Sequence, residues 1–368
     1  MKILLIHAVH FLLVCWLYPV TSRSQETVDA SESVGHSSSS TKGLFDTDEP
    51  LNIRLSGNIR ELMNDRIDHP KYHPLQLSYK AEEGNEVSLS IEAKTRGHFR
   101  KTMGNCTYPP ILLHFSKSDT LSSSIFSKQN KLKLVMPCRG DEYVIREWLV
   151  YKIYNLITPE SFNARLVRIE LNDTKRKKIS PPFYGFLLEE EQQMAKRNND
   201  VLINKQIRPE QTDSAAFLKM AVFEYLVGNT DWSVQYQNMK LIAKDSDAIP
   251  IPVPYDFDHA GIVNAPYALP AEELRMSSVR ERRYRGYCIT DLKKFDSTIE
   301  IYNGLRTAIY KLYTDCPLLE IKYVKSAVLY FDEFYHTIND PVALQKEFTY
   351  PCNKNGTGNV VIKGLKDE

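Results

Sequence analysis

The alternation of polar and apolar positions predicts a sheet in the first half of the chain. Two alternating runs within residues 73–96 flank a turn at 82–85, a pattern typical of a β-hairpin. Further apolar runs predict strands at 109–115, 131–136, 164–171 and 183–188. A helical period replaces the alternation over Asp141–Ile157. We therefore expect a mostly antiparallel sheet with one inserted helix.

After Glu189 the pattern of apolar positions becomes mainly helical. Asp213 or Ser214 is expected to cap one helix, and amphipathic spacing predicts two long helices at 292–313 and 321–338. The chain thus divides into a β-rich region at 44–190 and a mainly helical region at 191–368. Residues 229–261 interrupt the helical region with turn-like sequence that holds two acidic clusters.

The N-terminus has the composition of a targeting segment. Lys2 precedes an apolar run at 3–18 and a polar exit, which predicts a cleavable signal peptide over 1–24. Residues 25–43 are rich in Ser, Glu and Gly and predict a disordered linker. No later apolar run approaches the roughly 18 residues of a membrane span. We therefore expect an exported protein, periplasmic or extracellular, with no stable membrane span after signal cleavage.

The composition argues against nucleic acid as a partner and suggests a disulfide bond. The chain of 368 residues has a formal net charge of +1, so we expect no nucleic acid partner. Cys15 belongs to the predicted signal peptide, which leaves five of the six cysteines, and an oxidising compartment favours one or two disulfides. Cys106 with Cys138 is the preferred pair, since both lie in the same predicted sheet region.

The candidate chemistry lies in residues 229–261. Asp231 follows a predicted helix and comes seven residues before Asn238, so a short loop is expected to bring both side chains together. Asp256 and Asp258 follow a proline-rich strand, and alternation along an extended backbone points both in one direction, with Phe257 turned into the core. Carboxylate oxygens hold Mg²⁺ in phosphoryl-transfer sites. The stretch therefore predicts a divalent-metal and phosphate site.

Five short motifs follow one another along the chain: RGHFRK, NKLKLVMPC, LVGNTDWS, QNMKLI and VPYDFDHAG. Together they resemble the CotH-type spore-coat protein kinases. A longer pattern over about residues 51–334, with PPILLHF, LKLV, VPYDFD and SVRERRYRGYC, resembles a family of exported bacterial proteins distantly related to these kinases. The resemblance implies an α+β, two-lobed atypical protein-kinase-like fold, with an N-terminal antiparallel sheet lobe and a mainly helical C-terminal lobe. It also implies transfer of phosphate from ATP, with Mg²⁺ or Mn²⁺, to a hydroxyl group of an unidentified protein or small molecule.

The resemblance assigns roles to the polar residues of the acidic stretch. Asp231 would be the catalytic base, and Asn238 would be a metal ligand. Asp256 would be the principal metal-binding carboxylate, and Asp258 a second or supporting one.

The resemblance also implies cations on the nucleotide phosphates. Lys133, or failing that Lys131, would contact the α- and β-phosphates, and Glu147 would hold that lysine by an ion pair. The two lysines share one face of their strand, and Lys133 is preferred because leucines flank it on both sides. Arg96 and, further along the same segment, Arg100 would help to cover the phosphates, or both belong to a solvated basic turn.

Several alternatives stay open at this point. The chain has no G-x-G-x-x-G loop and no H-R-D triplet, so a nucleotide-binding pseudokinase fits as well as an active kinase. A metal-dependent hydrolase and a non-catalytic envelope protein are the further alternatives. The arginine-rich run at 275–285 either binds an acidic substrate or ties down a surface segment by ion pairs.

Overall fold

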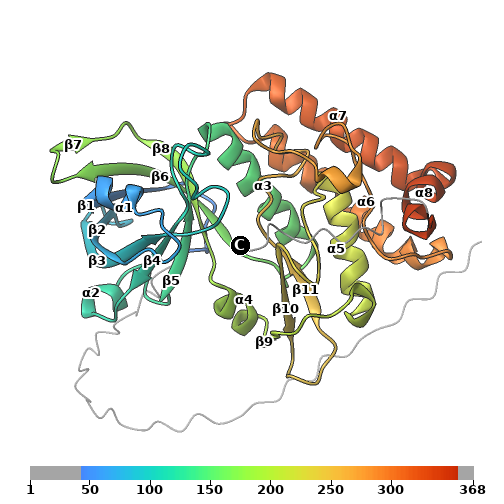
Figure 1. Ribbon diagram of the computed structural model, residues 1–368, viewed down its shortest axis with the longest axis horizontal. Coiled ribbons are helices and arrows are strands. Elements are labelled where there is room, and N and C mark those ends of the chain that lie inside the picture. The colour runs from blue at the N-terminus through green and yellow to red at the C-terminus, as the bar shows by residue number, and fades with distance from the viewer. Residues whose placement is uncertain (1–42, 355–368) are drawn as a thin grey trace, which may run out of the picture. The chain divides into compact units, whose positions relative to one another are not determined.

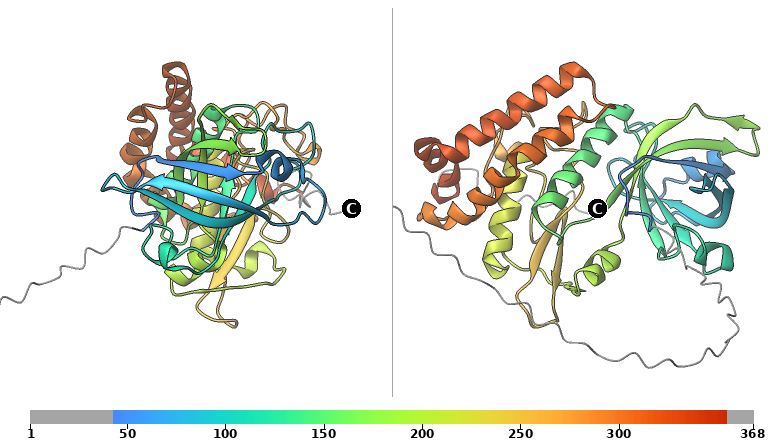
Figure 2. Two further views of the ribbon diagram at one scale, coloured as in Figure 1. Left: turned by 90° about the vertical axis from the view of Figure 1, so that its left-hand side faces the viewer. Right: turned by 180° about the vertical axis from the view of Figure 1, so that it is seen from behind.

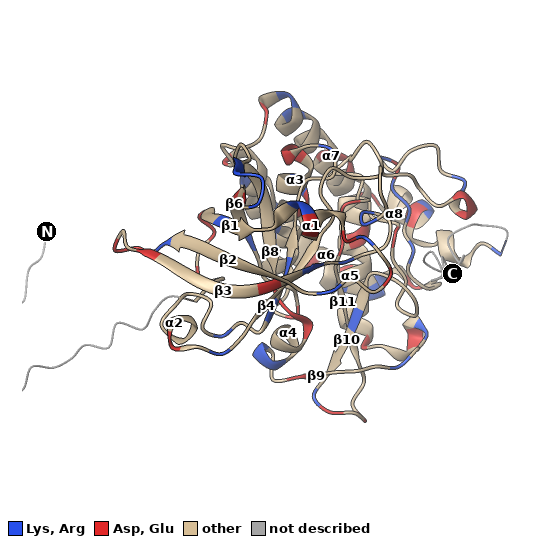
Figure 3. Ribbon diagram, turned by 60° about the vertical axis from the view of Figure 1, so that its left-hand side comes forward, with Lys and Arg blue, Asp and Glu red and all other residues tan. Residues whose placement is uncertain are grey.

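The computed structural model describes residues 43–354, which lie in one unit of the chain. The predicted signal peptide at 1–24 falls outside the described residues, as does the predicted linker at 25–43 except for its last residue. Within residues 43–354, no helix combines the length and the apolar character needed to cross a bilayer. Basic and acidic residues are interspersed along the strands and helices (Figure 3), in keeping with the near-neutral net charge.

Seven strands of the first half close into a mixed barrel (Figure 1). Their order around the barrel is β1-β2-β3-β4-β5-β8-β6, and the parallel pairing of β6 with β1 completes the ring. The other neighbouring pairs are antiparallel, and the short β7 forms a hairpin with β6. The strands are β1 (Leu51–Gly57), β2 (His73–Lys80), β3 (Glu86–Thr95), β4 (Ile111–Phe115), β5 (Lys131–Val135), β6 (Ala164–Asp173), β7 (Lys178–Ile179) and β8 (Phe183–Leu188).

This closed barrel contradicts the predicted two-lobed atypical protein-kinase-like fold with its N-terminal antiparallel sheet lobe. The difference rests on one parallel pairing, in which Leu51 of β1 lies opposite Val167 of β6. The pattern of polar and apolar residues identifies strands, but it does not identify partners so far apart in the chain. Closure is physically favourable because it pairs the strand edges that an open sheet would expose.

Most of the individual elements agree with the pattern of the sequence. The predicted hairpin is formed by β2 and β3, and the inserted helix α3 spans Asp141–Ile157 as expected. Strand β1 and the short helices α1 (Ile59–Asn64) and α2 (Asp119–Ser122) were not predicted.

Two hydrophobic cores meet at the wall of the barrel. Leu166 and Val167 are adjacent on β6 and both fully buried, Leu166 in the core under the helices and Val167 inside the barrel. Phe186 and Leu187 divide in the same way on β8. A strand that is covered on both faces has a continuous apolar run, which is the pattern of these two segments. Helix α3 packs on the outer face of β6 and β8 and so lies against the barrel.

Helices α5 to α8 gather on the side of α3 that faces away from the barrel (Figure 2), whereas α4 lies beside β9 and β10. A small antiparallel sheet of order β11-β10-β9 lies beside α5. These elements are α4 (Glu191–Arg197), β9 (Val201–Leu202), α5 (Ser214–Val227), β10 (Met239–Ala243), β11 (Ile251–Pro254), α6 (Asp296–Thr314), α7 (Ile321–Asn339) and α8 (Pro341–Phe348). Within the described part of the chain, single turns of 3-10 helix occur at Pro209–Gln211, Glu272–Leu274, Leu292–Phe295 and Tyr350–Cys352.

Two disulfides tie loops to these elements. Cys106 is bonded to Cys138, the pair preferred from the sequence, and Cys288 is bonded to Cys352. Cys316 is the free thiol among the described residues. The first disulfide joins the segment after β3 to the chain just beyond β5, so it fixes the segment that contains the RGHFRK motif.

Candidate functional site

Residues 229–261 form a loop whose two ends are joined. Gly228 ends α5 with a φ of 69°, a left-handed conformation that glycine adopts without strain. Its carbonyl accepts a hydrogen bond of 3.0 Å from the Gly261 amide. A β-carbon at Gly228 would lie 1.9 Å from the Tyr330 hydroxyl. Both ends of the loop are therefore packed closely against the helices. This packing holds in place the two ends of the segment that carries the acidic residues.

The structure brings Asp231 and Asn238 together, as their spacing predicted. The side-chain nitrogen of Asn238 donates to the backbone oxygen of Asp231 at 2.7 Å and to its Oδ2 at 3.1 Å. The side-chain amide of Gln237 donates to Oδ1 of the same carboxylate. Two amide side chains therefore hold the Asp231 carboxylate in one orientation.

The surroundings of Asp231 make its carboxylate suited to accept a proton. Burial is the largest cause that raises the pKa of its carboxyl group, and the charge of Asp258 adds to the rise. His259, Arg285 and the Asn238 hydrogen bond lower this pKa but do not cancel the effect of burial. A carboxylate with a raised pKa holds a proton more strongly, which is the property that a general base needs.

Asp256 and Asp258 follow β11 and lie on either side of a buried ring. Phe257 is fully buried and packs against Tyr151 with ring centroids 4.7 Å apart, so the prediction that it turns into the core is confirmed. The Tyr151 hydroxyl accepts a hydrogen bond of 2.9 Å from the Asp256 amide. Asp258 is buried and accepts a hydrogen bond of 3.1 Å from the Tyr267 hydroxyl. The core thus fixes the backbone that carries both carboxylates.

The electrostatics of this pair fit a divalent cation. Burial, followed by the charge of Asp258, raises the pKa of Asp256 to about 6, although Arg100 and Arg96 oppose the rise. Burial and the charge of Asp258 therefore disfavour the ionised form of Asp256, and a bound cation would favour it. Among residues 43–354, no three His, Cys, Asp or Glu side chains are placed to hold a metal by themselves. Mg²⁺ commonly takes one or two protein carboxylates and completes its shell with substrate phosphates and water, and this mode suits the loop.

Asn238 is placed to take part in the same site. Its backbone oxygen accepts a hydrogen bond of 3.1 Å from the amide of Tyr255, the residue before Asp256. The first and second acidic clusters of the sequence therefore lie side by side. The three predicted metal-binding residues, Asn238, Asp256 and Asp258, come from adjoining parts of one loop.

Lys133 reaches this loop from β5. Its ammonium nitrogen lies 4.8 Å from the centre of the Tyr255 ring. Burial, followed by the charge of Arg96, lowers the pKa of Lys133 to about 8, while Asp256 acts to raise it. Lys131 is exposed. Of the two lysines between which the sequence did not decide, Lys133 is the one beside the acidic loop, and Arg96 lies within electrostatic reach of it.

Glu147 forms its ion pair with Arg100, where the resemblance implied a lysine. Glu147 is buried on α3, and its Oε2 lies 3.6 Å from Nη1 of Arg100. The same nitrogen lies 3.7 Å from Oδ2 of Asp258, and Nη2 donates to the Met136 carbonyl at 2.6 Å. Arg100 therefore joins α3, the end of β5 and the acidic loop.

Sequence reasoning missed the residues that support the acidic loop from other segments. Arg100 was considered only as a cation for phosphate, and Tyr267 was given no role. Each contacts the site through tertiary structure, since Arg100 precedes β4 and Tyr267 follows Asp258 in irregular chain. The one available signal was the position of Arg100 within RGHFRK, and it does not identify Glu147 as the partner.

Comparison with known proteins adds no assignment to this geometry. No protein-family model matches the chain, and no curated protein matches it in sequence. The function is therefore argued from the side chains themselves.

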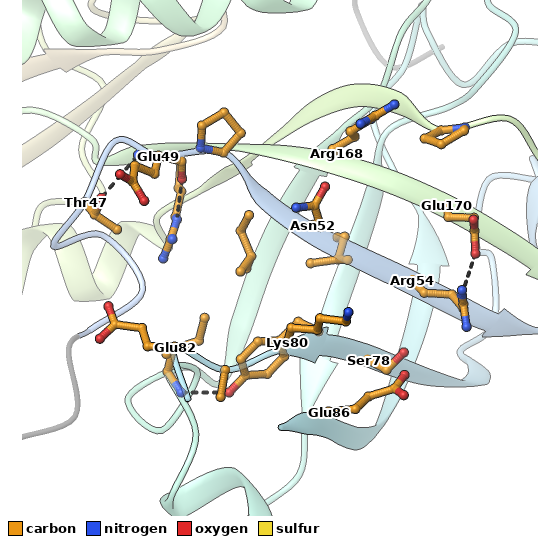
Figure 4. A pocket seen from close by; sticks show the side chains of 18 of the residues that line it. Thr47, Glu49, Asn52, Arg54, Ser78, Lys80, Glu82, Glu86, Arg168 and Glu170 are labelled. Carbon is orange, nitrogen blue, oxygen red and sulfur yellow. Dashed lines mark hydrogen bonds and ion pairs between the residues drawn. The ribbon is translucent and has the colours of Figure 1, made fainter. Parts of the chain in front are cut away.

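A separate cavity of about 690 Å³ lies on the barrel beside β1, β2 and β6 (Figure 4). Its polar lining mixes both signs of charge, and Arg54 pairs there with Glu170. Arg168 and Lys80 extend from the neighbouring strands. None of residues 229–261 lines this cavity, so the acidic loop and the cavity are distinct features.

Arg100 gives a direct test of the packing of the site. Replacement by methionine keeps much of the volume but leaves Glu147 and Asp258 buried without their cation. Loss of one partner from a buried ion pair costs about 3–5 kcal/mol, so Arg100→Met is expected to lower the free energy of unfolding by that amount. Urea denaturation at pH 7 measures the change. The control Arg139→Met alters an exposed side chain and is expected to change stability by less than about 0.5 kcal/mol. An equal effect of both variants would refute the role of Arg100.

Proposed function

We propose that the protein is a divalent-metal-dependent phosphotransferase that uses ATP as donor and a hydroxyl group of a protein or small molecule as acceptor. The observation that carries this proposal is the convergence of a desolvated lysine with carboxylates from a distant loop. Lys133 lies against the ring of Tyr255, the residue before Asp256, and the charge of Asp256 acts to raise the pKa of this lysine. A cation beside a carboxylate pair is the arrangement that binds nucleotide phosphates together with a metal ion.

The side chains divide into three roles in this proposal. Asp256 is the principal metal ligand with Asn238 beside it, while Asp258, already bonded to Tyr267 and facing Arg100, serves as the supporting carboxylate. When bound, Mg²⁺ or Mn²⁺ would neutralise phosphate charge. Asp231 is the base that accepts the proton of the attacking hydroxyl group, because its pKa is raised and its carboxylate is held by two amides.

The cations of the barrel complete the proposed site. Lys133 contacts the phosphates of ATP, and its lowered pKa of about 8 still leaves it mostly protonated at neutral pH. Arg96 adds a second positive charge at the end of β3. Lys133 lies on β5 and Arg96 directly follows β3, so the nucleotide phosphates would lie between the barrel and the acidic loop.

Export from the cytoplasm is part of the proposal. The predicted signal peptide indicates it, and the two disulfides agree with an oxidising compartment. The ordered motifs that resemble CotH-type kinases point to the same reaction, although the barrel departs from the fold that they implied.

Stabilisation by ATP tests the proposal. ATP with Mg²⁺ at 100 times its Kd should add about 2.7 kcal/mol to the free energy of unfolding, read as a rise in melting temperature. Lys133→Met should lose most of this rise, whereas Lys131→Met, on the same strand but exposed, should keep it. No rise in the wild type would contradict the proposal. A rise without transfer of phosphate to any acceptor would identify a nucleotide-binding protein without activity.

A metal-dependent hydrolase is the second candidate, and one observation favours it. His259 lies close enough to Asp231 to lower its pKa, and a histidine beside a carboxylate suits the activation of water. Release of free phosphate from ATP or from a phosphate ester, without transfer to a hydroxyl group, would support this candidate over the phosphotransferase.

A further inference from the structure

The arginine-rich run at 275–285 donates hydrogen bonds to backbone carbonyl groups of several different segments. Arg282 donates to the carbonyls of Tyr225 and Leu226 at the end of α5, and its guanidinium group stacks on the ring of Tyr330 at 3.4 Å. Arg285, three residues later, donates instead to carbonyls of the acidic loop. Both arginines therefore donate hydrogen bonds to backbone carbonyl groups, but Arg282 binds the end of α5 and Arg285 binds the acidic loop.

The target of Arg285 is the backbone on both sides of Asp231. Its Nη1 donates to the carbonyl of Thr230 at 2.5 Å and to that of Trp232 at 2.8 Å. The guanidinium carbon also lies 5.6 Å from the centre of the Trp232 ring. Thr230 and Trp232 are buried. Packing in the core and the hydrogen bonds from Arg285 therefore both hold this stretch of backbone. A guanidinium group suits this task because its N–H groups are held in one plane.

A buried carboxyl group lies behind the same loop. Glu224 on α5 is 1% exposed, and Asn229 and Arg285 are among the groups that lower its pKa against the larger effect of burial. Asp231 and Glu224 both act to raise the pKa of Arg285, which burial lowers to about 10. Arg285 is therefore still protonated at neutral pH and lies within reach of one carboxyl group on each segment. Arg285 therefore holds the loop by hydrogen bonds and interacts electrostatically with the Glu224 carboxyl group on α5.

We infer that Arg285 is a positioning residue that holds the backbone of Asp231, and that turnover depends on it while nucleotide binding does not. The inference rests on the proposed function only for its effect on turnover. Its structural part, the order of the loop, stands independently. The nucleotide contacts come from Lys133, Arg96 and Asp256, none of which Arg285 contacts in the hydrogen bonds described above, so the two effects are separable.

The test compares Arg285→Lys with the matched control Arg282→Lys. Lysine keeps the charge but loses the planar group, and a small displacement of a catalytic group costs up to about 10²-fold in rate. We expect Arg285→Lys to lower kcat by about that factor with the Kd for Mg-ATP unchanged. Arg282→Lys should leave kcat within a factor of about three, even where its melting temperature falls. An unchanged kcat in a folded Arg285→Lys, or an equal loss in the control, would overturn the inference.

Amide hydrogen exchange of residues 229–238 separates this inference from the proposed function. We expect faster exchange of this segment in Arg285→Lys than in the wild type and in Arg282→Lys, with unchanged exchange in the barrel. If the wild type transfers no phosphate, the proposed function fails and the exchange result alone decides whether Arg285 orders the loop. Equal exchange in all three proteins would overturn the positioning role. Should Arg285→Lys not fold, Arg285→Gln, which retains a donor for one carbonyl, replaces it in both measurements.

Discussion

Asp231→Asn is expected to lower the rate of phosphate transfer by about 10²- to 10⁴-fold, the usual contribution of a positioned general base. Asparagine keeps the size of the side chain and one acceptor for the amides of Gln237 and Asn238, so the loop should keep its conformation. It cannot take the proton of the acceptor hydroxyl group. Mg-ATP binding should therefore stay within a factor of about three while transfer is lost.

Single-turnover transfer from ATP and equilibrium binding of Mg-ATP are the two measurements. Asp247→Asn is the control, since Asp247 is an exposed aspartate in the turn between β10 and β11 of the same loop. The control should transfer phosphate at the wild-type rate. Retained transfer in Asp231→Asn would rule out the base assignment, and loss of binding together with transfer would place Asp231 among the metal ligands instead.

Asp256→Asn is expected to change binding and stability in opposite directions. Removing the principal metal ligand should weaken Mg-ATP binding by at least about 10- to 100-fold, the range for losing an outer-shell partner of a metal ligand. In the metal-free protein the same change removes a carboxylate that burial and Asp258 disfavour, so the melting temperature at pH 7 should rise.

The pH dependence of stability gives a further readout of Asp256. Its pKa in the folded protein is about 6, above the value of the unfolded chain, so the folded state binds the proton more strongly. Its contribution to stability is therefore present at low pH and is lost as the pH rises through about 6. Denaturation of the metal-free protein in EDTA should show this loss in the wild type and a smaller loss in Asp256→Asn. Identical pH profiles would contradict the electrostatic account of the acidic loop.

The sequence alone predicted the elements whose signals come from residues close together along the chain. The period of Asp141–Ile157 gave both ends of α3, and the alternation around the turn at 82–85 gave the β2–β3 hairpin. The spacing of Asp231 and Asn238 likewise gave a contact, because a short loop leaves few alternatives. Local pattern thus predicted most of the barrel strands, the long helices and the contact within the acidic loop.

Features that depend on distant parts of the chain could not be predicted. Closure of the barrel needs the parallel pairing of β1 with β6, and no local signal in β1 shows it. The partner of Glu147 is another case, because Arg100 and Lys133 are both basic and both precede α3. Only the path of the chain after β3, fixed by the Cys106–Cys138 disulfide, decides which of them meets Glu147.

In the proposed function, Lys133 and the carboxylates of residues 229–261 form one metal-nucleotide site. Calorimetric titration of the full chain with ATP, once with Mg²⁺ and once in EDTA, measures whether they do. We expect binding of one ATP per chain with Mg²⁺, strongly reduced in EDTA and in Asp256→Asn. Absence of binding with Mg²⁺, or binding that neither EDTA nor Asp256→Asn changes, would contradict the proposed function.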